Sequence, residues 1–307
     1  MRITNNMLSN NLLQNLESAQ GRMDKLQNQL SSRYKISRPS DDPAGVETAL
    51  RLKSSISYVE KWKANAGEGK DFMDTVDTTL GDMTLMLQRA KDIAEQGANG
   101  TNTKEDREKL AKEVDQIREQ LIETANTKFG SKYVFGGTIN EKPFPKGATD
   151  WKGSDDSVAY QVGSNLSIEV SVSGVKLFGV SGTSVPPNTN VGLFNTLTDL
   201  STNLRNTDPD ADGDGIRDLD KSMDQIEAQL DNVVNYRAEL GARYNRMESV
   251  YNQLDATSLN LTGSFSSIMD TDMAKTLIDF QSQKNVYQAA LSVGANIIQP
   301  SLVDFIK

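Results

Sequence analysis

The two ends of this chain carry the same pattern, an apolar stripe at heptad spacing. The N-terminal stripe consists of Leu8, Leu12, Leu16, Ala19, Met23, Leu26 and Leu30. The C-terminal stripe consists of Met273, Leu277, Phe280, Tyr287, Leu291 and Ile298. Steps of three and four place each set on one side of an α-helix, and neither helix can bury its stripe alone. The expected partner is the other terminal helix or a copy in a neighbouring subunit, which indicates assembly rather than catalysis.

Composition argues against several kinds of chemistry. The 307 residues are 36% hydrophobic and 6% aromatic, which is lean for one thick globular core and typical of helical bundles. The chain has no cysteine and no histidine, so disulfides, thiolate sites and the commonest general base are excluded. The net charge of -9 disfavours binding to nucleic acid or anionic lipid.

Neither a membrane span nor a cleaved signal peptide is expected. No apolar run approaches the roughly eighteen residues that a membrane-crossing helix needs. Apolar runs in the first thirty residues do not exceed a pair such as Leu12-Leu13, which is too short for the core of a signal peptide. Export of this chain would therefore use another route.

A connector and a long helix are expected after the N-terminal stripe. Residues 34–45 read as an extended connector that ends at a helix start, with Asp41 or Asp42 as the cap and Pro43 in the first position. The glycines and asparagine that begin at Gly97 end this helix.

Three apolar seams predict the helical part of the middle region. The first is Met73, Val76, Leu80, Met83, Leu87, Ala90 and Ala94, with a local break near Gly67 left open. The second helix starts at Thr103, ends before Gly130 and carries Leu110, Val114, Ile117 and Leu121. The third holds Met223, Ile226, Leu230, Val233, Leu240, Tyr244, Met247, Tyr251 and Leu254, interrupted by Arg237. These helices are expected to pack as an antiparallel rod.

The period changes to two between the second and third rod helices. Val158, Tyr160 and Val162 alternate with polar residues, and after a turn at 163–165 the alternation resumes through Leu166, Ile168, Val170 and Val172. This pattern predicts a β-hairpin. The surrounding Gly, Ser, Pro and Thr extend the prediction to a small β-rich domain.

The expected fold class is mainly α: an elongated antiparallel helical rod with paired terminal coiled-coil helices and a small inserted β-rich domain. The expected domains are a terminal coiled-coil domain of residues 1–40 and 263–307, a helical rod domain of residues 41–137 and 184–262, and a β-rich insert of residues 138–183.

Several segments of the chain resemble the flagellin family. The segments are residues 30–45 (LSSRYKISRPSDDPAG), 71–83 (DFMDTVDTTLGDM) and 87–101 (LQRAKDIAEQGANGT). Within residues 30–45, Arg33 stands where the family's signature has glycine and Ser37 where it has asparagine. The opening residues 1–4 (MRIT), residues 130–137 (GSKYVFGG) and the ending 287–307 are more similar to the family's hook-associated members at the hook–filament junction.

The resemblance implies a structural subunit of the bacterial flagellum that forms an adapter ring of identical copies at the hook–filament junction. It implies export, without a cleaved signal peptide, as an unfolded chain through the flagellar type III export apparatus after binding a cytoplasmic chaperone. The implied neighbours are the first hook-associated protein on one side and flagellin on the other. The paired terminal helices would line the central channel.

An acidic loop at residues 208–220 suggests a separate function, which owes nothing to the resemblance. It carries six aspartates and one arginine. Read from its second aspartate, it follows the ligand order of an EF-hand calcium loop, with oxygens from Asp210, Asp212, Asp214, the Ile216 carbonyl and Asp218. The order fails at position twelve, which is a lysine and not the usual glutamate. The alternative is a solvated acidic turn that caps a helix beginning near residue 219.

Two other functions stay open at this point. Flagellin proper, a filament subunit, shares the terminal and rod motifs. A calcium-dependent surface adhesin with a helical stalk would use the β-rich insert to bind its ligand. We expect that the chain requires no cofactor, with calcium as a possible ligand of the acidic loop. An enzyme is the weakest hypothesis because no nucleophile elbow, phosphate loop or paired-carboxylate motif stands out.

Overall fold

The computed structural model describes residues 5–99, 102–144, 153–179, 192–206 and 214–298. The chain divides into two compact units, one of residues 1–59 with 256–307 and one of residues 60–255. The expected domain limits at 40 and 263 both lie inside the first unit. Two long helices, α2 (Pro43–Ala98) and α6 (Asp214–Met269), contribute residues to both units.

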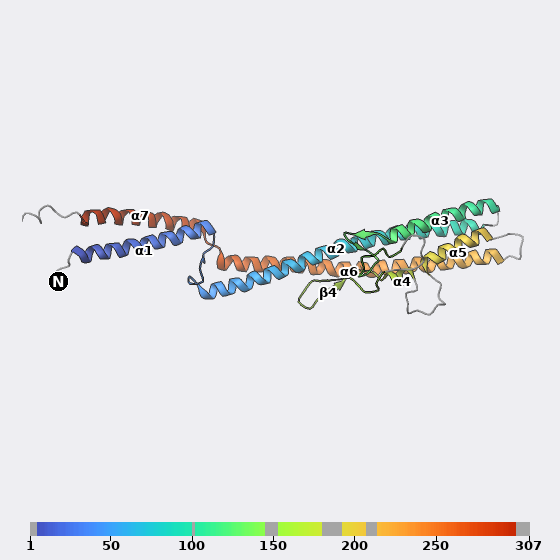
Figure 1. Ribbon diagram of the computed structural model, residues 1–307, viewed down its shortest axis with the longest axis horizontal. Helices are drawn as coiled ribbons and strands as arrows, with labels where there is room; N and C mark the ends of the chain where they lie inside the picture. The colour runs from blue at the N-terminus through green and yellow to red at the C-terminus, as the bar shows by residue number, and fades with distance from the viewer. Residues whose placement is uncertain (1–4, 100–101, 145–152, 180–191, 207–213, 299–307) are drawn as a thin grey trace, which may run out of the picture. The chain divides into compact units, whose positions relative to one another are not determined.

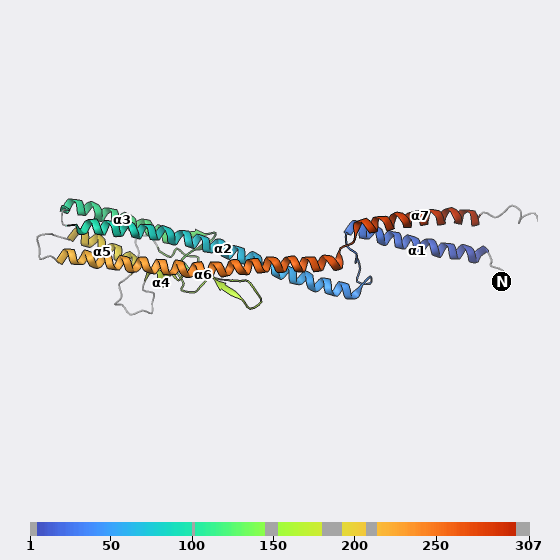
Figure 2. The same cartoon turned by 180° about the vertical axis from the view of Figure 1, so that it is seen from behind.

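The first unit pairs the two ends of the chain. Helices α1 (Asn5–Ser32) and α7 (Met273–Ile298) lie side by side and antiparallel, as both views of the ribbon show (Figures 1 and 2). The two chain segments that leave the pair are joined by a β-bridge between Tyr34 and Asp270. The N–H of Thr271 also donates to the carbonyl of Arg33 at 3.0 Å. The expected pairing of the terminal helices is therefore present.

The connector before α2 follows the capping chemistry expected from its sequence. Pro43 is the first residue of α2, and the Asp42 carboxylate accepts a hydrogen bond from the N–H of Gly45 at 3.0 Å. Asp41 caps the preceding turn by accepting from the N–H of Arg38 at 3.2 Å. Arg33 has a φ of 63°, a left-handed conformation that glycine adopts freely and that strains other residues. The arginine thus occupies a backbone position suited to the glycine of the family signature.

The second unit is a helical bundle built on α2 and α6. Asp77 pairs with Arg237 at 2.7 Å and Lys91 with Glu227 at 3.5 Å, so residue numbers rise along one helix as they fall along the other. The helices are therefore antiparallel. Helix α3 (Lys104–Ala125) packs on α5 (Leu193–Asn206) at one end of this bundle (Figure 1). Helix α2 runs unbroken from Pro43 to Ala98, so the helix has no break near Gly67, a point that the sequence left open.

The apolar seams of the rod are buried as expected. The fully or almost fully buried members include Met73, Val76, Leu80, Met83 and Leu87 of α2, Val114 and Leu121 of α3, and Ile226, Val233, Leu240 and Met247 of α6. Arg237 interrupts the α6 seam at the surface, where its guanidinium binds both Asp77 oxygens at 2.7 and 3.0 Å. Thr103 caps α3 by accepting from the N–H of Asp106 at 3.2 Å.

The predicted hairpin is formed by β3 (Ala159–Gln161) and β4 (Ser167–Glu169). The strands are antiparallel, with Tyr160 opposite Ile168. A second, unexpected hairpin joins β1 (Lys128–Phe129) and β2 (Lys132–Tyr133) through Gly130, whose φ is 58°. The short helix α4 (Gly174–Phe178) follows β4.

Aromatic rings hold this irregular part against the bundle. Phe178 of α4 stacks on Phe194 of α5 with ring centroids 5.4 Å apart, and Phe135 and Phe144 meet Phe178 edge to face at 5.3 and 4.8 Å. All four rings are buried, and Phe178 contacts each of the others. This cluster ties the chain before and after the hairpin to the helices.

Candidate assembly surface

The α1–α7 pair buries a narrow seam. On α1 the least exposed side chains are Leu12, Leu16, Ala19, Met23, Leu26 and Leu30, so the N-terminal stripe is confirmed over its described members. On α7 the seam consists of Thr276, Phe280, Gln283, Tyr287, Ala290 and Gly294. Half of these α7 residues are small or polar amide side chains, so the seam itself buries little apolar surface.

Close contact between the two helices fixes which side of α7 faces α1. A Cβ at Gly294 would lie 2.6 Å from Cδ2 of Leu12, so that leucine occupies space that a larger residue would need. The amide of Gln283 donates to the carbonyl of Ala19 at 3.5 Å. Glycine and alanine at these positions allow the helices to approach closely.

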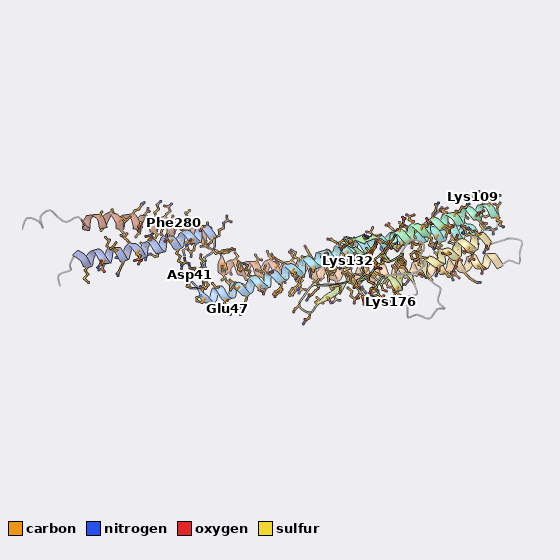
Figure 3. All side chains as sticks on the ribbon, in the orientation of Figure 1. Asp41, Glu47, Lys109, Lys132, Lys176 and Phe280 are labelled. Atoms are coloured by element: carbon orange, nitrogen blue, oxygen red, sulfur yellow. The ribbon has the colours of Figure 1, made fainter. Side chains whose placement is uncertain are left out.

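The expected C-terminal stripe is wrong at three of its positions. Met273, Leu277 and Leu291 lie beside the seam rather than in it and are 43%, 51% and 46% exposed. Phe280 and Tyr287 do face the seam, and Phe280 is labelled on α7 in Figure 3. The side chain of Ile298 lies outside the described residues. The buried side of α7 is therefore rotated by about one residue from the side that the sequence predicted.

The outward-facing apolar residues of α7 define what we term the α7 outer surface. It consists of Met273, Leu277, Ile278, Val286, Leu291 and Val293, each between 43% and 68% exposed. Helical spacing puts Met273, Leu277 and Leu291 on one flank of the seam, and Val286 and Val293 on the other. Helix α7 therefore carries apolar side chains on both flanks of the seam, where α1 leaves them exposed.

Charge is almost absent from the same helix. Lys275, Asp279 and Lys284 are its charged residues, and the stretch from Asn285 to Ile298 has none. Among the described residues, no helix combines the length and hydropathy needed to cross a membrane. A solvated helix with this surface and one packing partner has the character of an interaction site.

The acidic loop is only partly within the described residues. Asp210 and Asp212 lie outside them, and Asp214 is the first residue of α6, so the helix begins earlier than the expected residue 219. Ile216 lies inside that helix, where carbonyls accept from the residue four positions later.

Asp218 is engaged in local contacts. Its carboxylate accepts from Lys221 Nζ at 3.0 Å, and its carbonyl accepts from the Ser222 hydroxyl at 2.9 Å. Within the part of the chain that the structure describes, no group of three or more acidic side chains is arranged to hold a metal ion. The calcium site stays a prediction.

The connector carries one electrostatic contact that orders it. The ammonium of Lys25 donates to the Asp41 carboxylate at 2.9 Å, across from α1 to the connector. This bond and the N–H of Arg38 lower the pKa of Asp41. The carboxylate therefore stays ionised while it holds the connector turn.

Two family models match most of the chain, and their matches cover its helical ends. Residues 3–140 match the bacterial flagellin N-terminal helical region, and residues 223–306 match the bacterial flagellin C-terminal helical region. The chain belongs to the flagellin family. The two matches include α1, α7 and the α7 outer surface.

Relatives in the family carry two kinds of name. Flagellin of Bacillus subtilis is 27% identical over 97% of each chain. Flagellar hook-associated protein 3 of Escherichia coli is 26% identical over 94% of this chain and 95% of the relative. The two identities are nearly equal, so sequence identity does not separate a filament subunit from a junction subunit.

Solved structures share the fold. A putative flagellar hook-associated protein from Vibrio parahaemolyticus superimposes with a TM-score of 0.66 at 19% identity, covering 75% of this chain and all of that one. FlgL of Bacillus cereus gives a TM-score of 0.56 at 22% identity, covering 70% of this chain and 99% of the other. At these identities the likeness establishes the flagellin-like helical fold.

Proposed function

We propose that this chain is the adapter subunit of the hook–filament junction, in which identical copies associate through their terminal helices. The α7 outer surface carries the proposal, because its apolar side chains are exposed on a helix with few charges and have no partner within the described chain. Copies packed side by side would cover both flanks of α7 and bury the residues that α1 leaves exposed.

The junction is favoured over the filament by features outside the shared helices. The motif of residues 130–137 resembles the junction members, and its glycines have structural roles here. Gly130 and Gly137 have φ values of 58° and 65°, and a Cβ at Gly137 would lie 2.0 Å from the Ser154 carbonyl oxygen. The relatives named hook-associated protein 3 in Escherichia coli and Salmonella typhimurium also match almost end to end.

A filament subunit is the second candidate, favoured by the end-to-end match to Bacillus subtilis flagellin. The same α7 outer surface would serve either assembly. The two functions differ in how many copies a flagellum holds and where they lie, so location separates them.

The proposal also covers the proteins that contact the ring and the route by which the chain is exported. The first hook-associated protein and flagellin would contact the two sides of the ring, outside the cell. A chaperone and the flagellar type III export apparatus would handle the chain beforehand, when the apolar termini need protection. We propose a structural role and no catalysis, in keeping with a sequence that lacks both histidine and cysteine.

Deletion of the gene in its own bacterium tests this function. We expect cells that keep hooks, lose attached filaments and release flagellin into the medium, with recovery on expression of the intact chain. Loss of the filament protein itself would support the second candidate, and unchanged filaments would contradict both.

A further inference from the structure

A polar cleft lies in the second unit, where the chain around β4 packs on α6. Its walls come from residues 154–157, residues 169–176 and the α6 side chains between Tyr236 and Arg243, and we term it the insert cleft. It lies beside α4, whose Lys176 is labelled in Figure 3. Its volume of about 330 Å³ falls within the range of small-molecule sites, roughly 300 to 1,000 Å³.

Hydrogen bonds hold the walls of the insert cleft in place. The guanidinium of Arg243 donates to the carbonyl of Ser171 at 3.2 Å and to the carboxylate of Glu239 at 2.7 Å. On the opposite wall the Ser173 hydroxyl donates to the carboxylate of Asp155. These bonds join α6 to the chain after β4, and that chain to the loop before β3. The cleft is therefore shaped before a ligand enters, which lowers the entropy cost of binding.

Carboxylate oxygens supply acceptors to the cleft. Asp155 uses Oδ1 for the Ser173 hydroxyl, and Glu239 uses Oε1 for Arg243. The second oxygen of each carboxylate has no hydrogen-bond donor among the residues that the structure describes. An ionised carboxylate accepts through both of its oxygens. Each of these two side chains can therefore accept at least one further hydrogen bond from a ligand.

Donors are present in the same lining. Ser171 is only 5% exposed, and its hydroxyl oxygen accepts from the N–H of Val158 at 2.7 Å. Its O–H hydrogen has no acceptor within the described part of the chain, although a serine hydroxyl donates as well as accepts. The ammonium of Lys176 makes no ion pair with a described residue. These two groups need acceptors that the lining itself does not provide.

Tyr236 adds an aromatic ring with a polar tip. Burial raises the pKa of its hydroxyl, and the carboxylates of Glu239 and Asp155 raise that pKa further. The hydroxyl therefore stays protonated at neutral pH and donates. Val172 and Leu240, which are both buried, contribute apolar lining. A ring beside aliphatic side chains suits a ligand with an apolar face and polar edges.

This mixture of groups discriminates between classes of ligand. An ammonium ion only donates, so it would leave the Ser171 and Tyr236 hydroxyls without acceptors. A phosphate or a carboxylate would place negative charge in a lining that holds four carboxylates and two cations. A ligand hydroxyl both donates and accepts. A small ring that carries several hydroxyls and no charge therefore matches the lining.

We propose that the insert cleft binds a neutral saccharide. Asp155 and Glu239 accept from hydroxyls of the sugar, Ser171 and Lys176 donate to its oxygens, and the ring of Tyr236 packs on its C–H face. The site belongs to the second unit and does not use the α7 outer surface. It stands apart from the proposed function, so the failure of one leaves the other unaffected.

Saturation-transfer NMR on the full chain tests the site with named probes. The neutral probes are glucose, galactose, mannose, N-acetylglucosamine, maltose and lactose at millimolar concentration. Putrescine and glucuronic acid are the cationic and acidic comparisons. We expect saturation transfer to at least one neutral sugar and none to the two charged probes. Absence of transfer to every neutral sugar would overturn the site, and binding of putrescine instead would overturn the ligand class.

Two substitutions localise the binding. Glu239→Gln should weaken the affinity for the responding sugar by about tenfold, because it removes a charged acceptor with little change in volume. Tyr236→Phe should weaken it by about threefold, because it removes one neutral hydroxyl. Both should melt close to the parent.

Glu227→Gln is the matched control, because Glu227 is an exposed residue of α6 that pairs with Lys91 at 3.5 Å outside the cleft. We expect this variant to bind the sugar like the parent. Unchanged affinity in both cleft variants would overturn the placement of the sugar in the insert cleft, as would an equal loss in Glu227→Gln.

Discussion

Placing aspartates on the α7 outer surface should abolish assembly while leaving the fold intact. The variant Leu277→Asp with Leu291→Asp changes two residues that lie on the same flank of α7. Because these side chains are 51% and 46% exposed and are not members of the seam, their replacement leaves the seam residues in place.

The expected magnitudes follow from those exposed fractions. Full burial of a leucine is worth about 1.5 to 3 kcal/mol, so two half-exposed leucines have about 1.5 to 3 kcal/mol still to gain on assembly. Burying an unpaired carboxylate adds a cost of several kcal/mol. Association should therefore weaken by more than about a hundredfold. Folding should lose less than about 1.5 kcal/mol, from surface substitution and lower helix propensity.

Sedimentation of concentrated protein and thermal melting measure the two effects. We expect the parent to form oligomers and the double variant to stay monomeric, with a melting temperature lowered by less than about 6 °C. Leu85→Asp, in the second unit, should associate like the parent. Undiminished association of a folded double variant would refute the assignment of the α7 outer surface. A collapse of the melting temperature would instead mean that these leucines are buried in the monomer.

Three further predictions concern the core, the connector and the acidic loop. Leu240→Ala should lower the free energy of unfolding by about 2 to 5 kcal/mol, because it empties a site that is 2% exposed, whereas Leu85→Ala should change it by about 0.5 kcal/mol or less in denaturant titrations. Lys25→Ala should raise the pKa of Asp41 in an NMR titration. Since that pKa is lowered in the folded chain, the stabilisation is present above the ordinary aspartate pKa and is lost as the pH falls through the folded value. Asp210→Asn should remove any rise in melting temperature caused by millimolar calcium, and absence of calcium heat in calorimetry of the parent would leave the loop as a solvated turn.

Regular apolar periodicity explains why most of the helical fold could be predicted from the sequence. In the seam from Met73 to Leu87 and in the α6 seam, apolar residues recur at helical spacing and charged residues stand between them. The pattern therefore predicts a single buried side for each helix. Pro43 and Thr103 mark helix starts through backbone chemistry that is local to a few residues. The hairpin of Tyr160 and Ile168 likewise follows from alternation within one short segment.

Helix α7 shows where periodicity is insufficient. Its apolar residues surround the axis, so two adjacent heptad stripes share Phe280 and Tyr287, and the pattern alone does not choose between them. The choice is made by packing against α1, where Gly294 receives Leu12 and Gln283 reaches a backbone carbonyl. The sequence does hold a signal for the buried side of α7, which is its row of small residues, because small residues mark the side on which one helix backbone approaches another.

Helix α5 was missed for a different reason. Leu193, Leu197, Leu200 and Leu204 have helical spacing and are buried, but the helix is only fourteen residues long. Short helices gain their stability from tertiary packing rather than from propensity. The apolar side of α5 predicts a helix only when it is known that the apolar side of α3 needs a packing partner.

Location on the flagellum tests the central claim most directly. An antibody against the β3–β4 hairpin, applied to native flagella and viewed by electron microscopy with gold label, reports where the subunit resides. The account predicts label confined to a single band between hook and filament. Label distributed along the whole filament would contradict it and identify a filament subunit instead.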